Sequence, residues 1–422
     1  MSQTTEITTL DNGLRIATES MPGLQTASVG VWIDVGARYE APEVNGVAHM
    51  LEHMAFKGTV RRNAKDIAEA IENVGGQLNA YTSREHTAYY ARILADDLEL
   101  AVDLLADILQ HSAFDEEELA RERGVVLQEI GQVQDTPDDL VFDLFQETAF
   151  PGQALGRSIL GPAEIVAAMP RGSLIDYMAR NYGPGRMVLA AAGKVEHGRL
   201  VDLAQRLFRE LPEPAEPALD RASYQGGERR DARDLEQAHV MLGLPAFSYL
   251  DDDFYALQVL STALGGGMSS RLFQEIREKR GLAYSVFSFA SCYRDAGVLG
   301  IYAGTGEQET AELVPVVCEE FLKLIEAPGE EELVRARAQL KASLLMALES
   351  CSAQSEELAR QLLIFGRRIP PEEMIAKIDA VDQAALRRVG RRLLRDGRPT
   401  LTAIGPLGQL PDLDKVQRAL RF

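Results

Sequence analysis

Long apolar runs and cysteines are both scarce in this sequence of 422 residues. Residues 187–192 form one of the longest apolar runs, far short of the roughly 20 residues that a membrane-spanning helix needs. The first twelve residues are polar and lack the basic and apolar regions of a signal peptide. The three cysteines, Cys292, Cys318 and Cys351, are odd in number and lack metal-site spacing. We therefore expect no membrane association, reduced thiols and a cytoplasmic location.

Positive charge is scarce as well. The 44 Lys and Arg residues stand against 64 Asp and Glu residues, which gives a formal net charge of −20. A surface this acidic repels the phosphates of nucleic acids, so we expect no nucleic-acid partner. It suits a basic substrate, although the same charge is also explained by solubility alone.

Length and composition indicate a globular protein of more than one domain. The sequence is 46% hydrophobic and 26% charged, which is the balance of a soluble globular protein, and its length is enough for two or three domains. Three prolines between residues 211 and 218, followed by Gly226 and Gly227, are typical of a linker. We predict an N-terminal domain over residues 1–212, a linker over residues 213–233 and a C-terminal domain over residues 234–422.

Both halves carry strand and helix patterns in a similar order. The first half predicts strands at residues 6–10, 14–18, 28–35, within 77–94 and at 186–192, and helices at 45–57, 64–74, 97–110, 115–133, 137–145 and 197–207, with Asn45 as the cap of the helix at 45–57. The second half predicts strands at 238–244, 283–290, 298–304 and 400–404, and helices at 253–264, 309–325 and 331–348. Residues 118–121 (ELAR) match residues 332–335 (ELVR) at an offset of 214, which suggests a duplication. We predict two similar α+β domains, each a mostly antiparallel sheet packed with helices.

The pattern with the clearest chemistry is His49-Met50-Leu51-Glu52-His53. On a helix, residues 49, 52 and 53 share one face because each residue advances by about 100°. Two imidazoles at positions i and i+4 can hold one zinc ion, and the carboxylate between them can reach the water at such a site. The order His-x-x-Glu-His is that of the inverted zincins. The alternative is a helix with two surface histidines.

A hydrolytic zinc site needs a third protein ligand from elsewhere in the chain. Glu122 and Glu129 are the candidates on the predicted helix at residues 115–133, and their seven-residue spacing places both on one face. Glu129 is surrounded in sequence by apolar residues, and a partly buried carboxylate needs a partner such as a metal. Two ordinary surface glutamates on a solvated acidic helix are the alternative.

These residues resemble the pitrilysin-type (M16) zinc metallopeptidases, most of all the processing-peptidase β-subunit type and its bacterial single-chain relatives. The resemblance spans nearly the whole chain. The family places its third ligand 76 residues after the second histidine and an acidic helper seven residues before that ligand. It therefore implies Glu129 as the ligand and Glu122 as the helper. It also implies two domains that enclose a chamber in a clamshell-like arrangement, and an endopeptidase in which Glu52 is the general base.

The resemblance also implies residues that bind the substrate. The family binds an extended peptide as an added edge strand, which matches Asn79, Ala80 and Tyr81; without the resemblance these belong to an ordinary strand. An Arg–Tyr pair that holds the peptide and the developing oxyanion matches Arg277 and Tyr284. Without the resemblance, Arg277 would be interpreted as a basic helix end and Tyr284 as a half-buried aromatic residue.

Two acidic residues follow the third ligand at the distances where the processing-peptidase β-subunit holds an arginine of its substrate. They are Asp139 and Asp143, and two carboxylates can grip a guanidinium group. Acidic residues also cluster at helix starts without any such role. We expect a peptide substrate, short or unfolded, with basic residues near the cut.

At the offset of 214, Glu122 and Glu129 correspond to Ala336 and Ser343, so one zinc ion per chain is expected. The catalytic set and the second-domain set lie on the same chain, which favours a self-sufficient subunit and a homodimer. The competing hypothesis is a non-catalytic scaffold or partner subunit of the same family, although such chains typically have damaged metal motifs.

Overall fold

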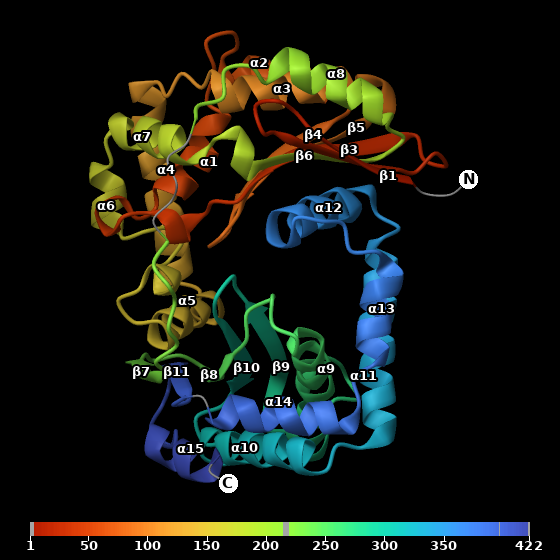
Figure 1. Cartoon of the computed structure of the whole chain (residues 1–422). Helices are drawn as coiled ribbons and strands as arrows, with labels where there is room; N and C mark the ends of the chain where they lie inside the picture. Colours follow the sequence, from red (N-terminus) through yellow and green to blue (C-terminus); the bar gives the residue numbers. More distant parts are fainter. Residues whose placement is uncertain (1–3, 214–218, 396, 421–422) are drawn as a thin grey trace. The chain divides into compact units, whose positions relative to one another are not determined.

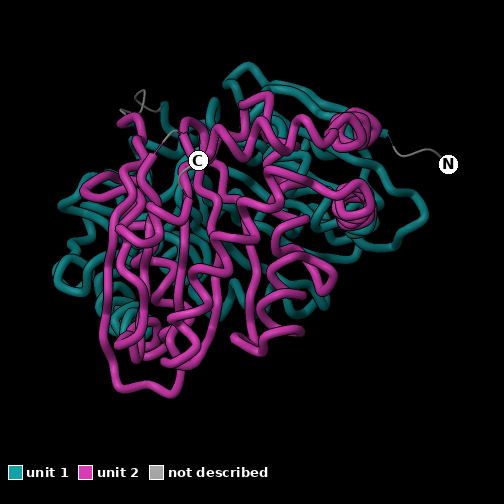
Figure 2. The backbone as a smooth tube through the Cα atoms, turned by 90° about the horizontal axis from the view of Figure 1, so that it is seen from below, with its two compact units in different colours: residues 1–131, 157–219, 346–369 teal, residues 132–156, 220–345, 370–422 magenta. Residues whose placement is uncertain are grey.

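The computed structural model describes residues 4–213, 219–395 and 397–420, and these residues form two compact units. Unit 1 contains residues 1–131, 157–219 and 346–369, and unit 2 contains residues 132–156, 220–345 and 370–422 (Figure 2). The two α+β units confirm the predicted fold class. Among the described residues, no helix combines the length and the apolar character needed to cross a membrane.

Unit 1 is built on a six-stranded sheet in the order β1-β2-β6-β3-β5-β4. All neighbouring pairs are antiparallel except β2 and β6. The strands are β1 (Thr4–Thr9), β2 (Arg15–Ser20), β3 (Thr26–Ile33), β4 (Gln77–Thr82), β5 (Thr87–Leu94) and β6 (Met187–Gly193). Within the part of the chain that the structure describes, strand β4 ends the sheet and pairs with β5 alone, so one of its edges is open.

Helices cover both faces of this sheet (Figure 1). The helices of unit 1 are α1 (Val47–Ala55), α2 (Ala64–Glu72), α3 (Leu98–Gln110), α4 (Glu116–Gln134, up to residue 131), α6 (Ala163–Ala168), α7 (Arg171–Asn181), α8 (His197–Leu207) and α12 (Cys351–Phe365). Helices α3 and α8 pack on one face, and α12 packs on the other against β2, β3 and β6.

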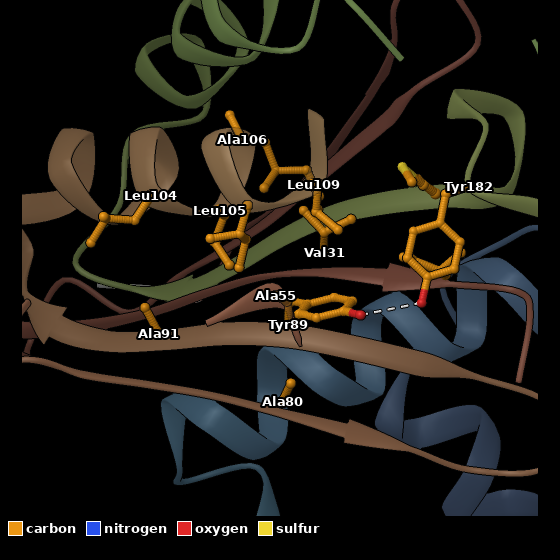
Figure 3. Packing of buried hydrophobic residues seen from close by; sticks show 14 of the residues in the cluster. Val31, Ala55, Ala80, Tyr89, Ala91, Leu104, Leu105, Ala106, Leu109 and Tyr182 are labelled. Atoms are coloured by element: carbon orange, nitrogen blue, oxygen red, sulfur yellow. Dashed lines mark hydrogen bonds between the residues drawn. The ribbon is translucent and has the colours of Figure 1, made fainter. Parts of the chain in front are cut away.

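The core between α3 and the sheet contains Tyr89, which connects strands β4 and β5 to helix α1. Tyr89 of β5 is buried under α3, and its hydroxyl lies 3.2 Å from the hydroxyl of Tyr182 (Figure 3). Tyr89 also contacts Phe56, the residue that ends α1, with ring centroids 6.4 Å apart, and it pairs with Ala80 of β4. Tyr89 therefore contacts the C-cap residue of α1 through its ring and pairs with the edge strand through its backbone.

Unit 2 has a five-stranded sheet in the order β7-β11-β8-β10-β9, with only β7 and β11 parallel. Its strands are β7 (Gly227–Ala232), β8 (Ala238–Ala246), β9 (Ala283–Cys292), β10 (Gly297–Thr305) and β11 (Thr400–Gly405). Its helices are α5 (Pro137–Ala149), α9 (Phe254–Gly265), α10 (Thr310–Glu326), α11 (Glu330–Ala347, up to residue 345), α13 (Pro371–Asp379), α14 (Gln383–Arg395) and α15 (Leu413–Leu420). Helix α5 packs on β7, β8 and β11.

The units differ from the consecutive ranges that the sequence suggests, because two segments are exchanged. Residues 132–156, with α5, pack in unit 2, and residues 346–369, with α12, pack in unit 1. Strand β7 occupies residues 227–232 inside the predicted linker at 213–233; residues 214–218 of that linker lie outside the described residues.

The exchange is reciprocal along the sequence. Helix α11 begins at Glu330, 214 residues after α4 begins at Glu116. Helix α12 begins at Cys351, again 214 residues after α5 begins at Pro137. Both helix pairs thus follow the offset found in the sequence, which supports a duplication.

Candidate metal centre and peptide-binding strand

Helix α1 begins two residues later than the sequence predicts. Asn45 does not cap it: the cap is Gly46, whose φ of +97° is in the left-handed region, and the Asn45 amide donates instead to Glu40 Oε2 at 2.7 Å and to the Ser158 carbonyl at 3.1 Å. The helix start is held by the buried Glu40, which accepts from the N–H groups of Gly46 at 2.9 Å and Ala48 at 2.8 Å. This long-range carboxylate satisfies N–H groups that a helix start otherwise leaves unpaired.

Three potential ligands converge within unit 1. His49 and His53 lie one turn apart on α1, and their Nε2 atoms are each 3.6 Å from Oε2 of Glu129 on α4. Ligand atoms of all three residues lie within 4.8 Å of one another. Two ligand atoms of a tetrahedral zinc site are about 3.3 Å apart, since Zn–N and Zn–O bonds are about 2.0–2.2 Å. The predicted set of His49, His53 and Glu129 is therefore together in space.

The protonation states also fit a metal. Burial, followed by the nearby His53, lowers the pKa of His49 to about 4, so its ring is neutral at neutral pH, as metal binding requires. The Nδ1–H of His53 donates to Oε2 of Glu122 at 3.0 Å, which leaves the Nε2 lone pair of His53 facing Glu129. Such a carboxylate–histidine pair orients metal-binding histidines.

Glu122 therefore contacts His53 on the side of the ring that faces away from Glu129. Its side chain is 6% exposed, and its other oxygen lies 2.7 Å from Nζ of Lys57. The buried carboxylate of Glu122 therefore has the Lys57 ammonium on one side and the His53 imidazole on the other. Lys57 was missed at the sequence level. Its position four residues after His53 was the available signal.

Glu52 lies on the same helix, half-buried and near the end of β4. Burial raises its pKa, and hydrogen bonds from Thr82 and the charge of His53 oppose the rise, while the Glu129 charge adds to it. A carboxyl group whose pKa is raised toward neutrality is suited to accept and return a proton. The role of general base that the resemblance implies for Glu52 stays a prediction, and the raised pKa is compatible with it.

Asn79, Ala80 and Tyr81 lie on β4, at the open edge of the sheet. The N–H of Ala80 donates to its neighbour's side chain, Asn79 Oδ1, at 2.8 Å. The Thr82 hydroxyl at the end of this strand donates to the Ala48 carbonyl of α1 at 3.4 Å, next to His49. An open strand edge therefore runs to helix α1, which carries His49 and His53.

The other predicted residues belong to unit 2. The Arg277 guanidinium lies over the rings of Tyr284 at 4.4 Å and Phe273 at 4.8 Å, and the Tyr284 side chain is largely exposed. Asp139 is exposed and Asp143 half-buried on α5. Burial, followed by the charges of Asp138 and Asp139, raises the pKa of Tyr302 to about 12. The Arg–Tyr pair is thus formed, and the acidic pair lies one turn apart on one helix.

Family models match most of the chain. Residues 15–163 match "Insulinase (Peptidase family M16)", and residues 168–340 match "Peptidase M16 inactive domain". A zinc protease of Streptomyces coelicolor is 42% identical over 95% of this chain and 89% of its own length. A probable mitochondrial-processing peptidase subunit beta of Arabidopsis thaliana is 42% identical over 98% of this chain and 81% of its own length.

Solved structures share the fold. A protease from Helicobacter pylori superposes with a TM-score of 0.87 at 24% identity, over 96% of this chain and all of that one. Nothing in these comparisons supports the expected homodimer, because the processing-peptidase relatives are named as β-subunits. The identities and the coverage of the family models show that the chain belongs to peptidase family M16 and is a zinc metalloendopeptidase.

Proposed function

We propose that this endopeptidase works through the inverted His-x-x-Glu-His motif, with one zinc ion per chain held by His49, His53 and Glu129, and that it cleaves short or unfolded peptides with basic residues near the cut. The observation that carries the proposal is the convergence of these three side chains on one point, with their ligand atoms within 4.8 Å. The alternative of a non-catalytic scaffold has less support, because the ligands, Glu52 and Glu122 are all present around that point.

A zinc ion held by His49, His53 and Glu129 would supply Lewis acidity, which lowers the pKa of bound water and polarises a peptide carbonyl. The chain supplies the rest. Glu52 accepts a proton from the water that attacks the scissile carbonyl and returns it to the leaving amine nitrogen. The raised pKa of Glu52 suits both transfers. Glu122, neutralised by Lys57, holds His53 in the tautomer whose Nε2 carries a lone pair.

The substrate is proposed to pair with β4 through its backbone, because the outer edge of this strand is open and ends at α1. Backbone pairing recognises an extended peptide with little demand on its sequence. Selectivity for a basic residue near the cut is assigned to Asp139 and Asp143, and the phenol of Tyr284, aligned by Arg277, is assigned to the developing oxyanion.

Glu52→Gln tests the proposal directly. The variant keeps the size and position of the side chain but cannot accept the proton, so we expect full zinc content with cleavage of a basic, unstructured peptide reduced by at least about 100-fold. Glu69→Gln, on the exposed face of α2, is the matched control and should cleave at the wild-type rate. A Glu52→Gln enzyme with wild-type activity would refute the assigned base, and a wild-type protein without zinc would refute the metal centre.

We also propose a cytoplasmic location. The three cysteines are all free thiols in the structure, as expected in a reducing compartment. Cell fractionation followed by immunodetection tests this, and recovery from a periplasmic or secreted fraction would contradict it.

A further inference from the structure

Unit 1 has a pocket of about 400 Å³ between the sheet and α12, next to the open edge strand. We call it the α12 pocket. The residues that line it and matter here are Trp32, Asn79, Tyr81, Tyr90, Arg92 and Glu356. All of them belong to unit 1, although Glu356 comes from the second half of the sequence. Neither the metal-binding residues nor Glu52 line it.

The pocket lies on the face of the sheet to which the side chains of Asn79 and Tyr81 point. Ala80 packs into the core beneath α3, whereas Asn79 and Tyr81 face the pocket. A peptide paired with the open edge of β4 continues the pleat, so every second side chain of that peptide points to the same side as Asn79 and Tyr81. This step rests on the proposed function, because it assumes that substrate pairs with β4.

The lining combines aromatic rings with a carboxylate. The rings of Tyr81 and Tyr90 have centroids 6.3 Å apart, and the Tyr81 hydroxyl donates to Oε1 of Glu356 at 2.9 Å. The half-buried Glu356 has no ion pair among the described residues, whereas a partly buried carboxylate is best satisfied by a cation. Aromatic faces beside a carboxylate suit an ammonium or guanidinium group.

Two positive groups also lie nearby. Arg92 lines the pocket but is exposed, and its Nε donates to Ser352. Arg360 is exposed and acts on Tyr81 through its charge. Water screens exposed charges more than the half-buried Glu356 carboxylate, so we take the carboxylate to dominate inside the pocket.

The corresponding helix of unit 2, α5, shows that this fold does not require a pocket between the helix and the sheet. At the offset of 214, Glu356 of α12 corresponds to Phe142 of α5. The Phe142 ring is stacked on Tyr302 at 5.6 Å and on Phe287 at 6.4 Å, and so fills the corresponding region between helix and sheet. Unit 1 has an acid and an open pocket where unit 2 has a packed aromatic ring.

We propose that the α12 pocket is a specificity subsite that receives a lysine or arginine side chain of the peptide bound along β4. Asp139 and Asp143 belong to unit 2 and do not line this pocket, so the subsite is proposed for a further basic residue of the substrate.

The test is a scan in which one lysine is moved along an otherwise alanine-flanked peptide that the wild-type enzyme cleaves. For each position of the lysine, the preference for lysine is the kcat/KM of the lysine peptide divided by the kcat/KM of the alanine peptide. We expect Glu356→Gln to lower this preference by about 10-fold at one position, which is the size expected for a charged hydrogen bond. Glu357→Gln is the matched control: Glu357 is the next residue on α12, does not line the pocket and accepts from Gln361 instead, so the ratio should not change.

The outcomes are distinguishable. If the wild-type enzyme cleaves no peptide, the proposed function itself fails. If it cleaves the peptides but Glu356→Gln changes the ratio at no position, while zinc content and circular dichroism stay normal, the subsite is refuted and the peptidase remains. A preference for glutamate in place of lysine, lost in Arg92→Gln, would also overturn the proposal, because Arg92 would then be the recognising group.

Discussion

Glu40 is the residue whose replacement should reveal most about how helix α1, with His49 and His53, is held in place. It is 4% exposed and accepts three hydrogen bonds, two of them from the backbone at the start of α1. Replacement by alanine leaves the N–H groups of Gly46 and Ala48 buried without acceptors, while Asn45 keeps its bond to Ser158. At about 1–3 kcal/mol for each unsatisfied donor, Glu40→Ala should destabilise unit 1 by about 4 kcal/mol.

The pH dependence of stability gives a sharper test. Burial raises the pKa of Glu40 to about 7, against the opposing hydrogen bonds from Ala48, Gly46 and Asn45 and the nearby charge of Arg157. A carboxyl whose pKa is higher in the folded state than the unfolded value of 4.5 contributes stability below about pH 4.5, and this contribution is lost as pH rises through 7. The loss amounts to about 3 kcal/mol, at 1.36 kcal/mol for each pKa unit.

Glu40→Gln cannot ionise and should lack this loss. The unfolding free energy of the wild type should therefore fall relative to that of the variant by about 3 kcal/mol between pH 5 and pH 8. The single tryptophan of the chain, Trp32, is buried in β3, so its fluorescence during urea unfolding reports on unit 1 alone. Glu43→Gln, an exposed residue of the same loop, is the control and should follow the wild type. Parallel pH curves for wild type and Glu40→Gln would show that this carboxyl group does not titrate in that range and would refute the reasoning.

Three further changes probe the site. Glu122→Gln should weaken zinc binding by about 10- to 100-fold in chelator competition, because the oriented imidazole of His53 loses its charged acceptor; unchanged affinity would contradict that role. Gly46→Ala should lower the unfolding free energy of unit 1 by about 2 kcal/mol or more, because its φ is +97° and a Cβ would lie 2.6 Å from the Leu160 carbonyl; a neutral result in urea unfolding would show that this loop can shift. Asp139→Asn with Asp143→Asn should reduce the preference for arginine over alanine near the cut by about 10-fold in a peptide library, and an unaltered profile would remove both residues from substrate selection.

Local sequence patterns located the histidine pair because its geometry is set within one helix. The third ligand was harder: helical periodicity left both Glu122 and Glu129 as candidates, since seven residues bring a side chain back to the same face. The structure uses both, on opposite sides of one ring, with Glu122 on Nδ1 of His53 and Glu129 facing Nε2. The apolar neighbours of Glu129 in the sequence indicated a partly buried carboxylate, and the spacing known from the resemblance then selected Glu129.

Contacts between distant segments were beyond the sequence patterns. The capping of α1 by Glu40 was missed because Asn45, the nearest polar residue, looked like an ordinary cap, whereas its amide bonds to Glu40 and Ser158. The exchange of α5 and α12 was missed for the same kind of reason. An amphipathic helix shows which of its faces is apolar, but not which of two similar sheets that face will cover.

The shared offset of 214 residues allows the corresponding helices of the two units to be compared residue by residue. Helices α4 and α11 begin 214 residues apart and have 19 and 18 residues, yet Glu122 corresponds to Ala336, a buried core residue, and Glu129 to the exposed Ser343. A carboxylate buried without a metal or a histidine partner costs free energy, so unit 2 is more stable with an apolar residue at the first position. The exchanged helices show the same distribution, because unit 1 has Glu356 where unit 2 has Phe142. In both pairs the polar residue lies in unit 1. Glu122 has His53 and Lys57 as its partners, whereas Glu356 has no ion pair among the described residues, and under our proposal a lysine or arginine of the bound peptide supplies it.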